Sequence, residues 1–176
     1  MSDDEVHTIN HVHFAQQLSR HIAAITRDGS IHFFDKHKSH KRLGTTEALE
    51  GFPLETMWER GDMVYTLWKS RDCNISLIAT DVNTFQSEVV GMLVVPNLKE
   101  WAVSSTHNVL ACYSVVTNIW GGKVGQIAGY SIADHLFHVM WSQECRLPDS
   151  VEKLCTADRQ FCFFGAHDDW GPIKTL

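Results

Sequence analysis

The amino-acid sequence predicts an all-β protein made of about four repeated antiparallel units, each with about four strands. Three observations support this prediction: pairs of apolar runs recur around polar turns, tryptophans recur at a similar spacing, and no long stretch has helical periodicity. A length of 176 residues fits a single β domain, which we expect to span residues 1–176. Hydrophobic residues make up 44% of the chain and charged residues 20%, so the chain can bury a core.

The stretch HIAAITRDGSIHFFD, residues 21–35, carries the strongest hairpin signal in the chain. Two apolar, β-prone runs flank a turn that contains Asp28 and Gly29. An Asp-Gly pair between such runs is typical of a tight β-hairpin. We expect these two residues to set the turn, with a positive φ near Gly29 that a β-branched residue would resist.

The hairpin pattern returns along the chain at a step of about 43 residues. Asp28 marks its first copy, Asp72 the next, and Asp158 a further copy after a double step. The copy between the last two spans residues 108–132 and has a Gly-Gly bend in place of the aspartate. The chain therefore reads as a series of repeats in which one turn has lost its marker.

A second marker repeats at nearly the same step. Trp58, Trp101 and Trp141 each stand where we expect a short strand to end just ahead of a hairpin. His13 and Phe14 hold the corresponding place in the first repeat. The two markers together divide the chain into units of about 6–48, 52–92, 93–133 and 134–176.

A unit of about 40–45 residues with four strands matches one blade of a β-propeller. The sequence resembles the WD40-like β-propeller family in RHIAAITRDGSIHFFD and in the run LFHVMWS ahead of LCTADRQFCFF. The chain departs from the family pattern because it lacks both the Trp-Asp dipeptide and the Gly-His pair. Phe34-Asp35 and Thr80-Asp81 stand where Trp-Asp is expected. The resemblance therefore implies a diverged propeller.

About four blades would be at the low end for a closed propeller ring. The last unit also leaves little room for an outer strand after HDDWGPIKTL. We therefore expect an incomplete ring, completed by a protein partner, by a second copy of the chain as a homodimer, or by further sequence of a longer propeller. A β-sandwich or barrel is the alternative fold, because many short strands with regular turns fit those architectures too.

The resemblance implies a non-enzymatic scaffold or adaptor subunit of a multiprotein complex, since no catalytic, cofactor-binding or metal-binding constellation stands out. The partner is expected to bind at the two open ends of the propeller, where apolar blade faces need cover. The residues expected to contact it are Ile9, His11, His13, Phe14, Phe161, Phe163 and Trp170.

The alternative function is a metal- or ligand-binding β-domain enzyme. His7, His11 and His13 share parity, so one extended strand would place them on one face, and alternating histidines are good metal ligands. The sequence offers no further ligand at a fixed spacing, so we expect no bound metal or other cofactor.

The charge balance argues against broad electrostatic binding. The net charge is −6, which disfavours nucleic acid except through the basic loop Lys36–Arg42. No apolar stretch is long enough to cross a bilayer, and we expect no membrane partner. Five cysteines without a CxxC pair, behind an acidic N-terminal segment, favour a reducing compartment, cytoplasm or nucleus.

Overall fold

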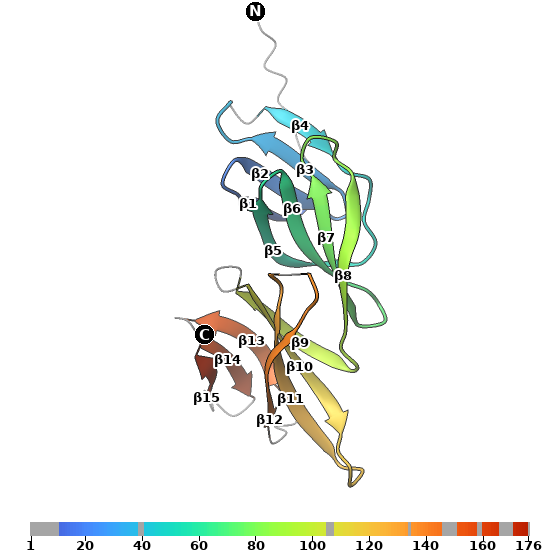
Figure 1. The fold of residues 1–176 in the computed structure, drawn as a ribbon, viewed down its shortest axis with the longest axis vertical. Helices are drawn as coiled ribbons and strands as arrows, with labels where there is room; N and C mark the ends of the chain where they lie inside the picture. The colour runs from blue at the N-terminus through green and yellow to red at the C-terminus, as the bar shows by residue number, and fades with distance from the viewer. Residues whose placement is uncertain are drawn as a thin grey trace, which may run out of the picture. The chain divides into compact units, whose positions relative to one another are not determined.

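The structure is a computed structural model of the chain (Figure 1). It describes residues 11–38, 41–104, 108–133, 135–145, 151–157, 160–165 and 171–175, with the backbone alone from residue 145 onward. This part of the chain contains fifteen β-strands and no helix. Within it there is accordingly no helix long and apolar enough to cross a membrane.

The strands form open sheets whose members follow one another in chain order. The first sheet contains β1 (Val12–Gln17), β2 (His21–Thr26), β3 (Ile31–Asp35) and β4 (Arg42–Thr45). The second contains β5 (Phe52–Arg60), β6 (Met63–Lys69), β7 (Asn74–Asp81) and β8 (Ser87–Val94). The third contains β9 (Leu98–Ser104), β10 (Val109–Thr117), β11 (Lys123–Ser131) and β12 (Val139–Cys145). A three-stranded sheet contains β13 (Val151–Ala157), β14 (Gln160–Gly165) and β15 (Gly171–Thr175).

This arrangement confirms the predicted all-β, propeller-like class with repeated antiparallel four-stranded units. The alternative of a closed barrel is wrong for the described residues, and a β-sandwich with Greek-key connections does not fit sheets whose strands follow one another in chain order. Each sheet ends in two edge strands and none closes on itself. Local meanders of this kind are the building unit of propeller blades.

The predicted map needs a correction at the third unit, which was expected to end near residue 133. The third sheet continues to Cys145, because β12 pairs with β11 and brings Trp141 opposite Gly129. A Cβ on Gly129 would lie 2.3 Å from the indole ring, so only glycine leaves room for this pairing. Trp141 therefore belongs to a fourth strand, whereas Trp58 and Trp101 lie on the first strands of their sheets.

Contacts within the chain group it into two compact units. Unit 1 comprises Met1–Arg71 and Ser76–Val90, and unit 2 comprises Asp72–Ile75 and Gly91–Leu176. That residues 1–176 act as one domain stays a prediction.

The core of unit 1 lies between the first and second sheets. Its buried residues are Leu18, Ala23, Ile25, Ile31, Phe33, Met57, Val64, Trp68, Ile78 and Val82. The central strands β2 and β6 contribute consecutive buried residues, whereas the edge strand β1 alternates between exposed and half-buried ones. Burial on both faces explains why these strands read as unbroken apolar runs in the sequence. The buried Trp68 indole donates to the Thr66 hydroxyl at 2.8 Å, so its polar atom is satisfied.

The core of unit 2 gathers around the centre of the third sheet. Its buried residues are Ala102, Val109, Ala111, Tyr113 and Ile127. Trp141 and Val115 pack against this cluster from the same sheet. The three-stranded sheet adjoins it through contacts between β13 and β9.

The repeated turns confirm the hairpin register for the first and second sheets. Gly29 in the β2–β3 turn has φ +90°, as the Asp-Gly pair predicted. Cys73 takes the equivalent place in the β6–β7 turn at φ 63°, a conformation that is uncommon for a residue with a side chain. Asp158 lies outside the described residues, and its hairpin joins β13 to β14, the first two strands of their sheet.

Candidate functional site

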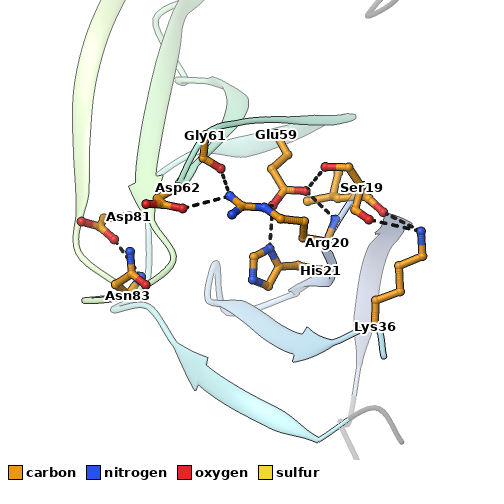
Figure 2. A network of polar contacts seen from close by, with 10 residues as sticks. Ser19, Arg20, His21, Lys36, Glu59, Gly61, Asp62, Asp81 and Asn83 are labelled. Carbon is orange, nitrogen blue, oxygen red and sulfur yellow. Dashed lines mark hydrogen bonds and ion pairs between the residues drawn. The ribbon is translucent and has the colours of Figure 1, made fainter. Parts of the chain in front are cut away.

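A polar network joins the first and second sheets at one end of unit 1, as Figure 2 shows. The β1–β2 turn supplies Ser19 and Arg20, and β5 supplies Glu59. The Ser19 hydroxyl donates to Glu59 Oε2 at 2.5 Å, and the Arg20 backbone N–H donates to the same oxygen at 2.9 Å. On the other carboxylate oxygen, Arg20 Nε lies at 3.2 Å and His21 Nδ1 at 2.7 Å. The Glu59 carboxylate thus contacts three successive residues, Ser19, Arg20 and His21.

The Arg20 guanidinium extends the network to the β5–β6 turn. Its Nη2 atom donates to the carbonyl of Gly61 and lies 3.0 Å from Asp62 Oδ1. Lys36 covers the other side of the β1–β2 turn, where its Nζ atom is 3.3 Å from the carbonyl oxygens of Leu18 and Ser19. The turn is therefore fixed by charged side chains from β5 and from the loop that follows β3.

Glu59 is the centre of this network, and its side chain is only 3% exposed. Burial by itself would raise the pKa of the carboxyl group, but hydrogen bonds from Ser19, the Arg20 backbone and His21 outweigh it and lower the pKa to about 2. Glu59 is therefore ionised at neutral pH. The hydrogen bonds hold it as an anion between the two sheets.

The network connects the first and second sheets through one carboxylate. Within the described part of the chain, no group of three or more His, Cys, Asp or Glu side chains is placed to hold a metal ion. No local sequence pattern predicts the network, because its partners come from segments about 40 residues apart. A buried glutamate before a Gly-Asp turn carries no short-range pattern that would reveal it.

A second contact between the sheets uses an amide side chain. Gln16 on β1 donates from Nε2 to the Met57 carbonyl at 2.9 Å and accepts from the Met57 N–H at 3.2 Å. Met57 follows an irregularity in the β5–β6 pairing that begins at Leu54. The side-chain amide therefore pairs with a backbone segment on the open edge of β5.

The structure does not place the predicted histidine face on one regular strand. His7 lies outside the described residues. His11 precedes β1 with φ 62°, and the β1–β2 register shifts between Val12 and Phe14. A left-handed residue and a bulge break the alternation that one shared face requires. His11 and His13 are both exposed.

The other predicted partner residues are divided between packing and the undescribed part of the chain. Phe14 is half-buried and packs against the core of unit 1. Ile9 and Trp170 lie outside the described residues. Phe161 and Phe163 lie on β14, the middle strand of its sheet, where only the backbone is described. The partner-binding role of all these residues stays a prediction.

The basic loop Lys36–Arg42 is partly used inside the protein. Lys36 covers the β1–β2 turn, and Arg42 donates to the Thr45 hydroxyl. The Asp35 carboxylate accepts from the backbone N–H groups of His37 and Lys38, which orders the start of the loop. Two of the basic side chains thus use hydrogen-bond donors on internal contacts.

A different surface stands out in unit 2, at the β10–β11 turn. Ile119 is 91% exposed and Trp120 is 86% exposed. The Asn118 side chain orders this turn, because its Oδ1 atom accepts from the backbone N–H groups of Trp120 at 3.0 Å and Gly122 at 2.8 Å. Asn118 thus does in this repeat what the aspartate does in the first hairpin. This surface was not predicted from the sequence, although a tryptophan next to a Gly-Gly turn indicates an exposed aromatic side chain.

Comparisons with known proteins identify the fold but no family. No protein-family model matches the sequence, and no curated protein matches it significantly. The structure is similar to the computationally designed Ika4 protein at a TM-score of 0.54 and 10% identity, over 93% of this chain and 91% of that one. It is similar to the computationally designed Ika8 protein at 0.51 and 12% identity, over 90% and 44%.

The structure is also similar to a natural propeller, the Cps50 (Swd1) β-propeller domain of Myceliophteria thermophila. The TM-score is 0.53 and the identity 11%, over 88% of this chain and 50% of that one. The chain therefore spans about half the length of the Swd1 domain and of Ika8. At such low identities the likeness establishes a propeller-like fold and nothing about activity.

Proposed function

We propose that the chain is a non-enzymatic scaffold module of the WD40-like type, and that a protein partner or a second copy of the chain completes its propeller. The observation that carries this proposal is the match of nearly the whole chain to about half of a natural β-propeller domain. The described residues form three four-stranded sheets and one three-stranded sheet, which are only part of the sheets that a ring of seven or eight blades uses.

The faces of neighbouring sheets bury large apolar side chains against each other. In unit 1, large side chains such as Phe33 and Trp68 are fully buried where two sheets face each other. In a propeller each blade needs a neighbour on both sides, so the outer face of a terminal blade requires cover. A standard interface buries about 800 Å² on each partner, and apolar surface contributes about 25 cal/mol per Å² removed from water.

We place the partner at the two terminal sheets, at the segments around Ile9–Phe14 and Phe161–Phe163. Phe14 already packs against the core of unit 1, so its part in the interface is indirect. We further propose that the protein works in a reducing compartment, cytoplasm or nucleus. Cys73 and Cys112 are both free, and burial raises the pKa of the Cys112 thiol to about 12, which keeps it unreactive.

The experiment is sizing of the purified chain by multi-angle light scattering. We expect a mass above the 20.0 kDa of one chain, and disassembly when Phe161 and Phe163 are changed to Asp. Phe52→Asp is the matched control, because Phe52 is 61% exposed and a carboxylate at this position remains in contact with solvent. Circular dichroism checks that each variant keeps its β signal. A compact, stable monomer of 20.0 kDa would overturn the proposal.

A further inference from the structure

The β10–β11 hairpin differs in charge from the chain around it. The protein carries a net charge of −6, yet no Asp or Glu occurs in the sequence between Glu100 and Asp134. In the same stretch Lys123 is the only Lys or Arg. A segment of this length without a carboxylate can approach a negatively charged surface without the repulsion that the rest of the chain would meet.

The hairpin also projects beyond the other strands of its sheet. Pairing with β9 ends at Ser114 opposite Leu98, and pairing with β12 ends at Gly125 opposite Cys145. The β10–β11 ladder continues to Thr117 opposite Lys123, and the turn follows. At about 3.4 Å per strand residue, the ladder continues about 10 Å beyond the last pair with β9 and about 7 Å beyond the last described pair with β12 before the turn begins. Figure 1 shows this extension in yellow to orange.

The end of the projection is apolar and ordered. Ile119 and Trp120 expose nearly their whole side chains, so the folded part of unit 2 gives them no cover. Backbone bonds between Asn118 and Gly122 close the turn, and the Asn118 side chain fixes it further. The two apolar side chains are therefore held at the tip by a preformed loop.

Positive charge lies directly behind the tip. Lys99 and Lys123 line one hollow of about 270 Å³ together with Asn97, Val115 and Thr117. Neither lysine forms an ion pair with another described residue. The hairpin thus has an apolar tip with two lysines behind it. The polar side chains of Asn97 and Thr117 line the same hollow as the lysines.

We propose that the β10–β11 tip docks on an anionic lipid surface, with Ile119 and Trp120 in the bilayer interface and Lys99 and Lys123 against the headgroups. Interfacial side chains are buried by about 5–10 Å, which matches the reach of the tip. Tryptophan favours this depth because its ring is apolar and its N–H is polar. Anionic lipids attract lysines close to the surface.

A lipid surface fits this tip better than a protein pocket does. A protein interface of standard size needs about 800 Å² on each side, whereas the projecting part of the hairpin exposes only two of its apolar side chains, Ile119 and Trp120. A bilayer adapts to a narrow projection without a complementary cavity. The proposal departs from the expectation of no membrane partner, which rested on the whole-chain charge and on membrane-spanning segments only, and it is independent of how the propeller is completed.

The test is vesicle flotation of the whole 176-residue chain. We expect binding to phosphatidylcholine vesicles that contain about 30% phosphatidylserine, and about tenfold weaker binding to pure phosphatidylcholine. Raising the ionic strength from about 0.1 M to about 1 M shortens the Debye length from about 10 Å to about 3 Å and should weaken binding further. Absence of binding to the anionic vesicles overturns the proposal and would assign the tip to a protein contact.

Variants locate the site. Trp120→Ser should weaken binding by about tenfold or more, and Lys99→Glu and Lys123→Glu by about tenfold each. Trp120→Phe should keep most of the binding but lose the fluorescence quenching that brominated lipids cause in the parent chain. Quenching that persists unchanged in Trp120→Phe, or full binding by Trp120→Ser, would overturn the proposal.

Two matched controls exclude general stickiness. Phe52→Ser removes an exposed aromatic side chain from unit 1, and Lys38→Glu reverses an exposed charge in the basic loop. Both should leave vesicle binding unchanged. A loss in Lys38→Glu as large as that in Lys123→Glu would show that net charge alone drives binding, and the docking role of the tip would be wrong.

Discussion

The β2–β3 turn and the β10–β11 turn occupy the same place in their sheets, between the second and third strands, yet they end up in opposite environments. In the first, the Asp28 carboxylate accepts from the Thr26 hydroxyl and the Ser30 N–H, which hold the pKa of Asp28 below its ordinary value. In the second, the Asn118 amide oxygen accepts from two backbone N–H groups. A short polar side chain therefore organises both turns.

The difference lies in what covers each turn. The Gly29 carbonyl accepts from the Leu49 N–H at 3.0 Å, so the segment after β4 lies against the first turn. No atom comes within 4 Å of the position that a Cβ would take on Gly121. The two turns therefore share a local structure but differ in environment. The β2–β3 turn is packed against another segment, and the β10–β11 turn is exposed to solvent.

The largest expected effect is a difference in the free energy of unfolding between alanine variants of Gly29 and Gly121. Gly29→Ala should lower the free energy of unfolding by about 3–4 kcal/mol, because φ is +90° and the new Cβ would lie 2.4 Å from the Leu49 oxygen. Gly121→Ala meets only the cost of its positive φ, about 1–2 kcal/mol. Denaturant unfolding of both variants measures the difference. Equal losses would contradict the idea that one turn is packed and the other is not.

The second-largest expected effect is that low pH destabilises unit 1 more than the β10–β11 hairpin. The pKa of Glu59 falls from 4.5 to about 2 on folding, so its contribution is complete above pH 4.5 and is lost as the pH falls toward 2. The loss should amount to about 3 kcal/mol in unit 1, while the β10–β11 hairpin has no carboxylate to protonate. Hydrogen exchange at low pH compares the two regions.

Glu59→Gln is the control for this acid effect, since it removes the titrating group and should flatten the dependence. If unit 1 and the β10–β11 hairpin lose protection together between pH 4.5 and 2, the network around Glu59 is not the cause.

A smaller effect is expected from the side chain that orders the displayed turn. Asn118→Ala removes two hydrogen bonds on an exposed loop and should cost about 1 kcal/mol. Asn118→Asp should cost less, because aspartate makes the equivalent bonds in the first hairpin. Thermal unfolding and backbone NMR shifts of the turn measure the change. A loop unaffected by Asn118→Ala would mean that its glycines alone define it.

The smallest effect should come from the displayed tryptophan itself. Trp120→Ser should change the free energy of unfolding by less than about 0.5 kcal/mol, because the side chain contacts little of the fold. Trp68→Ser should cost at least about 3 kcal/mol, since Trp68 is fully buried. A large loss in the first variant would show that the tip packs inside the folded protein, contrary to its exposure.

The fold was readable from the sequence because its signals are local. Apolar runs around Asp28 and Asp72 identify hairpins within single sheets, and their step gives the length of a unit. The boundary near Trp141 was misplaced because that residue repeats at the right step but lies on a fourth strand, and only its pairing with Gly129 reveals this.

The sites were less readable because they depend on distant residues and on exposure. The partners of Glu59 come from another sheet, and no spacing rule connects them. The exposure of Trp120 depends on where β9 and β12 stop pairing with the hairpin. The histidine alternation failed for a local reason, since the positive φ of His11 ends the extended geometry that the pattern assumed.

The amide of Gln16 has a consequence for solubility. An edge strand with unpaired backbone groups is a template on which another chain can add a strand and begin an aggregate. On β5 the N–H and carbonyl of Met57 already bond to this side chain, and the register there is broken. A foreign strand would have to displace the amide and straighten the bulge before pairing. In the folded chain, the first sheet thereby shields the β5 edge of the second sheet from strand addition by other copies.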